Sequence, residues 1–342
     1  MNAKATTATT TSAAAVAAPG AGSAVPKAEF DWKPIALLIG LMAAALPAMG
    51  SASTWLTLTV AGLAMGLIVF VIASGLTLVF GLMDVLNFGH GLFIAIGAFM
   101  ATTVMGWTGT SVVGVFASML VAMAVAGAIG WAFERVIVRP VYGLHLKQIL
   151  ITMGGMIVGE ELIKATWGPQ QIALPLPEAL RGSWVLGEAA VEKYRVLAAA
   201  IGLVVFAALV FTLNRTKIGL LIRAGVQDRE MVEALGYRIR RLFVGVFAAG
   251  SALAGLGGVL WGLYQQSVTP QIGAQVNVLI FIVIIIGGLG STLGCFVGAL
   301  LVGLMANYTG FLAPKVALFS TIGLMVGVLL WRPQGLYPVT NR

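Results

Sequence analysis

The sequence predicts an all-α polytopic membrane helix bundle with about eight to ten transmembrane segments and broken helices. Of its 342 residues, 59% are hydrophobic and only 9% are charged, which excludes a soluble enzyme, a disordered chain and a disulfide scaffold. Asp, Glu, Lys and Arg are absent from residues 34–83, 85–133 and 242–314. About 20 apolar residues cross a bilayer as a helix, so these stretches hold about two, two and at least three spans. The apolar runs are continuous, which favours helices over a β-barrel.

Ten segments are apolar enough to enter the membrane, and several of them are too short to cross it alone. They are residues 35–49, 54–80, 91–105, 111–132, 146–166, 194–213, 242–264, 276–288, 293–308 and 314–331. Eight full spans with two re-entrant pieces fit the same pattern. The short segments flank Gly-rich or polar breaks at 81–90 and 287–294, and such discontinuous helices are typical of a transport path. The two breaks could be corresponding parts of two structural repeats.

Basic residues gather in a few loops, which predicts the orientation of the chain. Loop 214–241 carries seven of them and loop 133–147 carries three, so both are placed in the cytoplasm with the two termini. Loop 167–195 has three basic and three acidic residues and is placed outside. This bias accounts for the net charge of +8 without a nucleic-acid partner. The predicted parts are a disordered cytoplasmic tail at 1–33, a transmembrane domain at 34–332 and a second cytoplasmic tail at 333–342.

Polar side chains occur at three-residue intervals in the first break. Asp84, Asn87 and His90 follow one another there, with Phe88 among them. Polar groups at membrane depth are costly unless they face a cavity or each other, so we expect a broken helix that lines a substrate path. The alternative is structural, because Asn87 and His90 could cap helix ends.

The turn at 264–277 is polar and uncharged and lies between two apolar segments. Its Gln265 and Gln266 are further candidates for the substrate path, as part of an outer gate. A docking surface or an ordinary solvated turn would have the same composition.

Charged residues at the end of segment 146–166 have the spacing of an ion pair. Glu160 and Glu161 precede Lys164 by four and three residues, which places them on one helix face. A proton relay is the alternative to such an interfacial pair.

Small residues recur every four positions in two segments, which lets helix backbones approach closely. The rows are Gly250, Ala254, Gly258 and Gly262 in the first segment, and Gly290, Gly294 and Gly298 in the second. We expect packing within the bundle rather than a subunit interface.

Metal and cofactor sites are not expected. Cys295 is the single cysteine, and the two histidines, His90 and His145, fall in different parts of the predicted topology. The sequence contains no phosphate-binding G-x-x-x-x-G-K-[ST] loop, so ATP would not bind to this chain by the usual route.

The basic loop 214–241 predicts a short amphipathic helix that ends near Gly236. Such a helix could lie on the lipid surface or dock a soluble partner. Acidic residues among the basic ones argue mildly against pure lipid binding.

The chain contains, in this order, the stretches GLTLVFGLMDVLNFGHG (75–91), ERVIVRPVYG (134–143), IALPLP (172–177), IGLLIRAGVQDREMVEALGY (218–237), GGLGSTLGCFVGALLVG (287–303) and LLWRPQGL (329–336). Taken together, they resemble the LivH-type permease subunit of branched-chain amino-acid ABC importers. The resemblance spans residues 56–336.

The resemblance implies a non-enzymatic permease in a bacterial inner membrane. Its partners would be a LivM-like second permease, two cytoplasmic ATP-binding subunits and a periplasmic substrate-binding protein. The substrate would be a branched-chain amino acid or a related small amino acid, amide or carboxylate. Six residues would match the loop that contacts the ATPase: Arg223, Asp228, Arg229, Glu230, Ala234 and Gly236.

The chain departs from the family pattern at Asp84, where the family often has glycine or another small residue. Segment 35–49 and the tail before it also look additional to shorter members. An ATP-independent channel or secondary transporter for a small neutral solute such as urea is the alternative function.

Overall fold

The uncharged stretches of the sequence fold into helices. The computed structural model describes residues 31–227 and 229–338, and each of the ten predicted segments in these ranges holds one α-helix. The helices are α1 (Lys33–Ala48), α2 (Ala52–Met83), α3 (His90–Thr108), α4 (Val112–Phe133), α5 (His145–Trp167), α6 (Lys193–Arg215), α9 (Ile239–Gln265), α10 (Ile272–Gly287), α11 (Thr292–Leu312) and α12 (Ala317–Trp331). The predicted tail at 1–33 lies almost wholly outside the described residues, as do residues 339–342.

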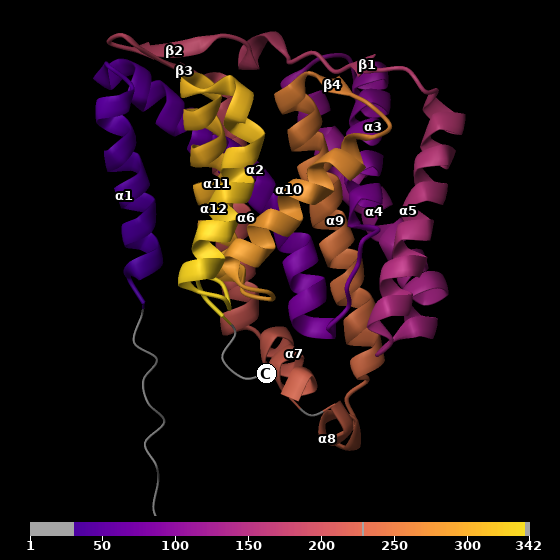
Figure 1. Cartoon of the computed structure of the whole chain (residues 1–342). Coiled ribbons are helices and arrows are strands. Elements are labelled where there is room, and N and C mark those ends of the chain that lie inside the picture. The colour runs from indigo at the N-terminus through magenta and orange to yellow at the C-terminus, as the bar shows by residue number, and fades with distance from the viewer. Residues whose placement is uncertain (1–30, 228, 339–342) are drawn as a thin grey trace, which may run out of the picture. The chain divides into compact units, whose positions relative to one another are not determined.

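Helix α2 lies at the centre of the helical unit that begins at Lys33, and it packs against α6, α9 and α11 (Figure 1). Helix α2 carries apolar residues on every side, and every residue from Gly66 to Phe80 is buried. Helix α9 packs against α2 and also against α3 and α4. The core therefore lies along α2 and α9, and the prediction of a helical membrane bundle is confirmed.

Six helices of the described residues are long and apolar enough to cross a membrane. They are α2, α3, α4 extended to Val141, α6, α9 and α11. Helices α1, α10 and the end of α12 are apolar but shorter. The predicted number of crossings and the inward placement of both termini stay predictions.

Two small antiparallel sheets lie at one end of the bundle, and the sequence did not predict them. Strands β1 (Ile172–Ala173) and β4 (Ser267–Val268) form one, and the hairpin of β2 (Ser183–Leu186) and β3 (Ala189–Glu192) forms the other. Strands of two to four residues are too short to display an alternating pattern. The hairpin is fastened to α2, because the backbone N–H of Ala190 donates to Thr57 Oγ1 at 3.2 Å.

Short helices form the connections at the other end of the bundle (Figure 1). A π-helix (Glu134–Val138) and a 3-10 helix (Arg139–Val141) join α4 to α5, and residues 134–144 are called the elbow here. Helices α7 (Lys217–Gln227) and α8 (Arg229–Ala234) lie in the predicted amphipathic loop. Two more 3-10 turns lie elsewhere: Glu178–Leu180 is between β1 and β2, and Pro314–Val316 joins α11 to α12.

The segment after α12, residues 332–338, folds back onto the end of α10 and is called the C-terminal strap here. The backbone N–H groups of Leu336 and Tyr337 donate to the carbonyls of Ile286 and Gly287 at 2.9 and 3.0 Å. The Leu336 side chain is fully buried. The last carbonyls of a helix have no partner within it, so the C-terminal strap caps α10 from outside the helix.

Apart from Gly262, which faces side chains, the glycines of the two predicted rows lie against neighbouring backbone within this chain. A Cβ on Gly250 would lie 2.6 Å from the carbonyl oxygen of Gly75 in α2. Gly258 meets the backbone of α3 in the same way. The remaining contacts are those of Gly290 with Gly81, of Gly294 with Gly287 and of Gly298 with Val283.

Candidate functional site

Helix α2 stops at a residue with left-handed backbone. Asp84 has φ 53° and ψ 35°, and its N–H still donates to the carbonyl of Phe80 at 3.0 Å. Aspartate is one of the few residues apart from glycine that adopt this conformation readily. Residues 84–89, called the broken segment here, are not helical and lead to the start of α3 at His90.

A second break lies directly beside the first. Residues 288–291 separate α10 from α11, and both Gly288 and Gly290 have positive φ. A Cβ on Gly81, in the last turn of α2, would lie 2.8 Å from the Cα of Gly290. The two breaks that the sequence predicted are therefore neighbours in space.

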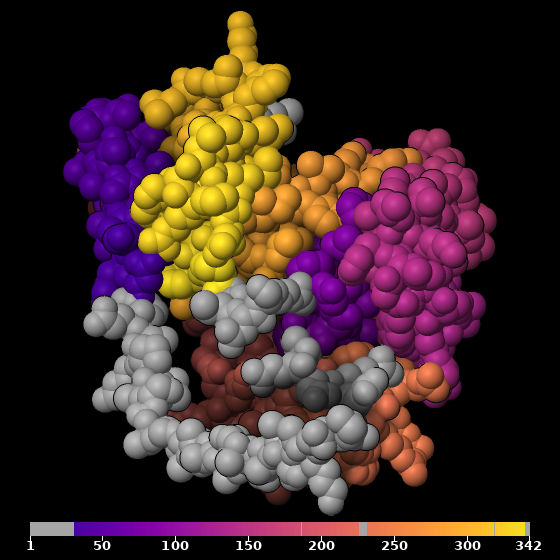
Figure 2. Space-filling model, turned by 60° about the horizontal axis from the view of Figure 1, so that its bottom comes forward, coloured from indigo at the N-terminus to yellow at the C-terminus, as the bar shows by residue number. Residues whose placement is uncertain are grey.

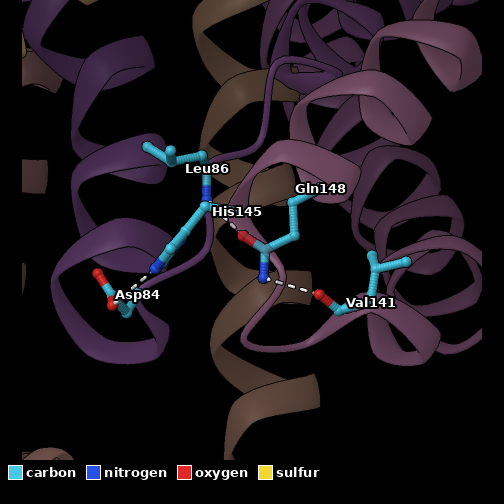
Figure 3. A network of polar contacts seen from close by, with 5 residues as sticks. All are labelled: Asp84, Leu86, Val141, His145 and Gln148. Carbon is cyan, nitrogen blue, oxygen red and sulfur yellow. Dashed lines mark hydrogen bonds and ion pairs between the residues drawn. The ribbon is translucent and has the colours of Figure 1, made fainter.

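Side chains replace the backbone hydrogen bonds that the first break removes. Thr152 Oγ1 accepts from Phe88 N at 3.1 Å, and Asn277 Nδ2 donates to the Phe88 carbonyl at 3.1 Å. Gln148 Oε1 accepts from Leu86 N at 3.3 Å (Figure 3). Non-helical backbone is tolerated at membrane depth where neighbouring elements satisfy it in this way.

The polar residues of the break are divided between a buried and an exposed group. Asn87 and His90 are 1% and 0% exposed. Asn87 Oδ1 accepts from Gly89 N at 3.0 Å, which is a local turn bond, and the first turn of α3 has no side-chain cap. His90 Nε2 lies 3.1 Å from the carbonyl oxygen of Ile72.

Three polar atoms around the break are buried without a hydrogen-bond partner: Asn87 Nδ2, His90 Nδ1 and Asn277 Oδ1. The orientation of each amide is fixed by the bond that its other end makes to the broken segment. Asn87 thus offers a donor and Asn277 an acceptor. Buried polar atoms are usually hydrogen-bonded, and no residue in the described part of the chain supplies a partner for these three.

The exposed members of the site lie at its edges. Asp84 Oδ2 is 3.8 Å from Nε2 of His145, the first residue of α5, and both side chains are about half exposed. The Phe88 ring stacks on Phe281 of α10, with 4.6 Å between ring centroids.

The structure does not bring Gln265 and Gln266 to the break. Both are exposed at the far end of α9, where Gln266 has φ 52° and accepts from Leu174 N at 3.0 Å. They belong to the turn that carries β4, at the opposite end of the bundle from α7 and α8 (Figure 1).

The predicted ATPase-contact residues lie on α7, α8 and the turn after them. Arg223 donates to the carbonyl of Leu213 at 2.7 Å. Ala234 is the last residue of α8, and Gly236 follows with φ 87°, as a helix stop requires. Asp228 lies outside the described residues, and the side chains of Arg229 and Glu230 are likewise not described.

An open groove of about 510 Å³ lies beside this turn. Its lining comprises Glu233, Gly236, Tyr237, Arg238, Arg240 and Arg241. Three of the six are arginines, so the groove is basic.

The charged residues near the far end of α5 form an ion-pair cluster. Lys164 Nζ lies 3.0 Å from a Glu160 oxygen and 2.8 Å from a Glu161 oxygen. These are the i,i+4 and i,i+3 pairs that the sequence indicated. The alternative of a proton relay stays untested.

Sequence reasoning missed Gln148, Thr152 and Asn277. A signal was available for the first two, because they are polar residues four positions apart in an apolar segment. Asn277 falls at the edge of the polar turn 264–277, so its sequence position gave no sign that it bonds to the broken segment.

A bundle of long apolar helices with two adjoining helix breaks defines a multi-pass membrane protein of the transporter class. Residues 58–329 match the family described as "Branched-chain amino acid transport system / permease component", and the chain belongs to this family.

Curated relatives agree with that assignment. The high-affinity branched-chain amino acid transport permease LivH of Salmonella typhimurium is 30% identical over 287 residues, which cover 80% of this chain and 92% of the relative. BraD of Pseudomonas aeruginosa is 30% identical and covers 80% and 93%. LivM of Escherichia coli is 28% identical and covers 90% and 75%. No solved structure matches the chain.

Proposed function

We propose that the chain is the transmembrane permease subunit of an ATP-driven importer for branched-chain amino acids, or for related small amino acids, amides or carboxylates. The observation that carries this proposal is the contact between two helix breaks, at Gly81 and Gly290, inside a bundle of the permease family. Paired discontinuous helices are typical of substrate sites in transporters. The names of the curated relatives support the choice of substrate.

The broken segment borders the substrate path in this proposal. Asn87 has a free donor and Asn277 a free acceptor, and both side chains are at least nine-tenths buried. A zwitterionic amino acid has a carboxylate to accept from the one and an ammonium group to donate to the other. Asn87 and Asn277 therefore suit an amino-acid substrate. Neither side chain is charged, so they would not bind the substrate tightly.

The basic loop is the ATPase contact, with Arg223, Asp228, Arg229, Glu230, Ala234 and Gly236 as contact residues. Its helix α8 reaches the break, because Val232 is buried in a cluster with Ile239 and Phe243, and Met83 packs against that cluster. Met83 is the residue before Asp84, so movement of α8 has a short route to the broken segment.

As a permease component, the chain works with ATPase and binding-protein partners. In full, we propose a LivM-like second permease, two cytoplasmic ATP-binding subunits and a periplasmic substrate-binding protein. Loops 167–195 and 265–275 would meet the binding protein at the end opposite to α7 and α8.

Uptake by reconstituted liposomes tests this function. We expect labelled leucine to enter only when ATP, both ATP-binding subunits, the second permease and the binding protein are all present. Uptake by this chain alone without ATP would instead support a channel or secondary transporter. If another solute stimulates the ATPase and leucine does not, the architecture stands and the substrate assignment is wrong.

Reversal of two charges tests the ATPase contact. The double variant Asp228→Arg with Arg229→Asp should hydrolyse ATP with at least tenfold less uptake per ATP, while membrane insertion is unchanged. Normal coupled uptake by this variant would contradict the placement of the contact.

A further inference from the structure

One face of α5 meets every second residue of the broken segment. His145, Gln148 and Thr152 are three and four residues apart, so they share a helix face. The contacts pair His145 with Asp84, Gln148 with the N–H of Leu86, and Thr152 with the N–H of Phe88. The three α5 residues are called the α5 clasp here.

The spacings of the two elements match. A helix rises 1.5 Å per residue, so successive residues of the α5 clasp are separated by roughly 4.5 and 6 Å along α5. Alternate residues of a fully extended chain are separated by roughly 6.6 Å, which is an upper limit for the broken segment, because Asp84 is left-handed and residues 88–89 form a turn. The Asp84–His145 contact joins two side chains, with 3.8 Å between Oδ2 and Nε2, so it does not require equal backbone spacing at that end. The α5 clasp thus holds the broken segment in one register.

One residue of the α5 clasp, Gln148, also attaches the broken segment to the elbow. Gln148 Nε2 donates to the carbonyl of Val141 at 3.1 Å, while its Oε1 accepts from Leu86 (Figure 3). Thr152 Oγ1 donates to the Gln148 carbonyl at 2.6 Å. Gln148 and Thr152 are both 0% exposed, so water does not compete for these bonds. A single amide therefore bridges the elbow and the broken segment.

Elsewhere α5 is lightly held by this chain. Its buried residues are Gln148, Thr152, Gly159 and Ile163, so half of them belong to the α5 clasp. Figure 2 shows α5, in magenta, at the edge of the bundle, with α10 set back between it and α12. A helix with so few anchoring positions can shift while the core around α2 and α9 stays in place.

We propose that the α5 clasp consists of positioning residues that set the register of the broken segment, so that a shift of α5 or of the elbow opens or closes the passage beside residues 84–89. This inference rests on the proposed function, in which the broken segment borders that passage. The clasp residues act through backbone groups of the segment and need not touch substrate.

Thiol labelling tests the α5 clasp without any substrate. A single cysteine is placed by Leu86→Cys in a Cys295→Ala background, and its reaction rate with a maleimide is measured in membranes. Thr152→Val removes the acceptor for Phe88 at nearly constant volume and should raise the rate at least tenfold. Thr152→Ser restores the hydroxyl and should bring the rate to within twofold of the parent.

Thr166→Val is the matched control. Thr166 lies on the same helix, is exposed, and donates only to carbonyls of α5 itself, those of Leu162 and Ile163. This variant should label at the parental rate. Equal rates for Thr152→Val and Thr166→Val would overturn the proposal.

An exchange of the exposed pair tests positioning during transport. In the complete importer, Asp84→His and His145→Asp should each raise the ATP consumed per solute at least threefold, and the double exchange should restore the ratio. Histidine tolerates left-handed backbone better than most residues, so the fold should survive. A double variant as impaired as the single ones would contradict a paired role.

The experiments can overturn the proposed function and the α5 clasp independently of each other. A parent complex without ATP-dependent uptake of any branched-chain amino acid overturns the proposed function, and the labelling rates still show whether the contacts of the α5 clasp hold the segment. Normal uptake by the parent, with no effect of Thr152→Val on labelling, overturns the α5 clasp alone.

Discussion

At the scale of single residues, Asp84 decides where α2 ends. Its left-handed backbone turns the chain away from the helix axis after Met83. Its carboxylate also reaches His145 of α5, which glycine could not do. Aspartate at this position therefore adds one contact at the edge of the broken segment and keeps a backbone conformation that glycine would also adopt.

The stability of Asp84 variants should depend on how readily the new residue adopts the left-handed backbone conformation. Asp84→Val puts a β-branched residue in the left-handed region, at a cost of about 1–2 kcal/mol of stability. Asp84→Gly should fold at least as well as the parent, because glycine adopts this region without strain. Thermal unfolding in detergent measures both variants. A lower unfolding temperature for the glycine variant than for the valine variant would contradict this explanation of the break.

The sequence identified Asp84, Asn87 and His90 because polar residues are conspicuous in an apolar stretch. It could not identify Gln148, Thr152 and Asn277, because they lie far away in the chain and meet the backbone of the broken segment only through tertiary packing. Gln265 and Gln266, which the sequence placed at an outer gate, lie at the opposite end of α9 from the basic loop, and their part in the path stays a prediction. Composition locates polar groups but does not show which of them meet.

At the scale of helices, close packing depends on glycines that face a neighbour. Gly250 of α9 meets the backbone of Gly75 in α2, whereas Gly245 of the same helix has nothing within 4 Å of its Cβ position. Adding one methyl group at each position therefore compares a glycine that faces backbone with a glycine that faces open space.

Gly250→Ala should lower stability, and Gly245→Ala should not. The methyl group at Gly250 overlaps fixed backbone, and overpacking of this kind costs about 1–3 kcal/mol. At Gly245 alanine should be neutral or stabilise by about 1 kcal/mol, because it favours the helix more than glycine does. Thermal unfolding of both purified variants measures the difference, and equal unfolding temperatures would contradict close packing of α2 against α9.

The C-terminal strap should be required for an intact end of α10. A chain that ends at Arg332 loses the donors to Ile286 and Gly287 and the buried Leu336 side chain. It should unfold at least 4 °C below a control chain that ends at Pro338, because at least one hydrogen bond and one buried leucine are lost. Equal unfolding temperatures would show that the C-terminal strap does not stabilise the bundle.

Helices were the most predictable part of this protein. Each apolar segment became a helix because lipid leaves the backbone few alternatives. The C-terminal strap and the hairpin β2–β3 were not foreseen, since each is fixed by contacts with a distant element rather than by its own periodicity.

At the scale of the whole molecule, the central feature is the meeting of two helix breaks between a basic loop and a lightly held helix. Met83 packs against the cluster of α8 and α9, and the broken segment that follows it is bonded to α5 and α10. In the proposed mechanism, movements of the basic loop and of α5 converge on residues 84–89, where a gate would be driven from one side of the membrane.

Accessibility of the broken segment from the two sides of the membrane tests this account most directly. Phe88→Cys in a Cys295→Ala background would be labelled with a membrane-impermeant maleimide in the complete importer. The account predicts faster labelling from the side of α7 and α8 without ATP, and faster labelling from the opposite side with ATP and the binding protein. Labelling that is the same from both sides in every state would contradict a gate at the broken segment.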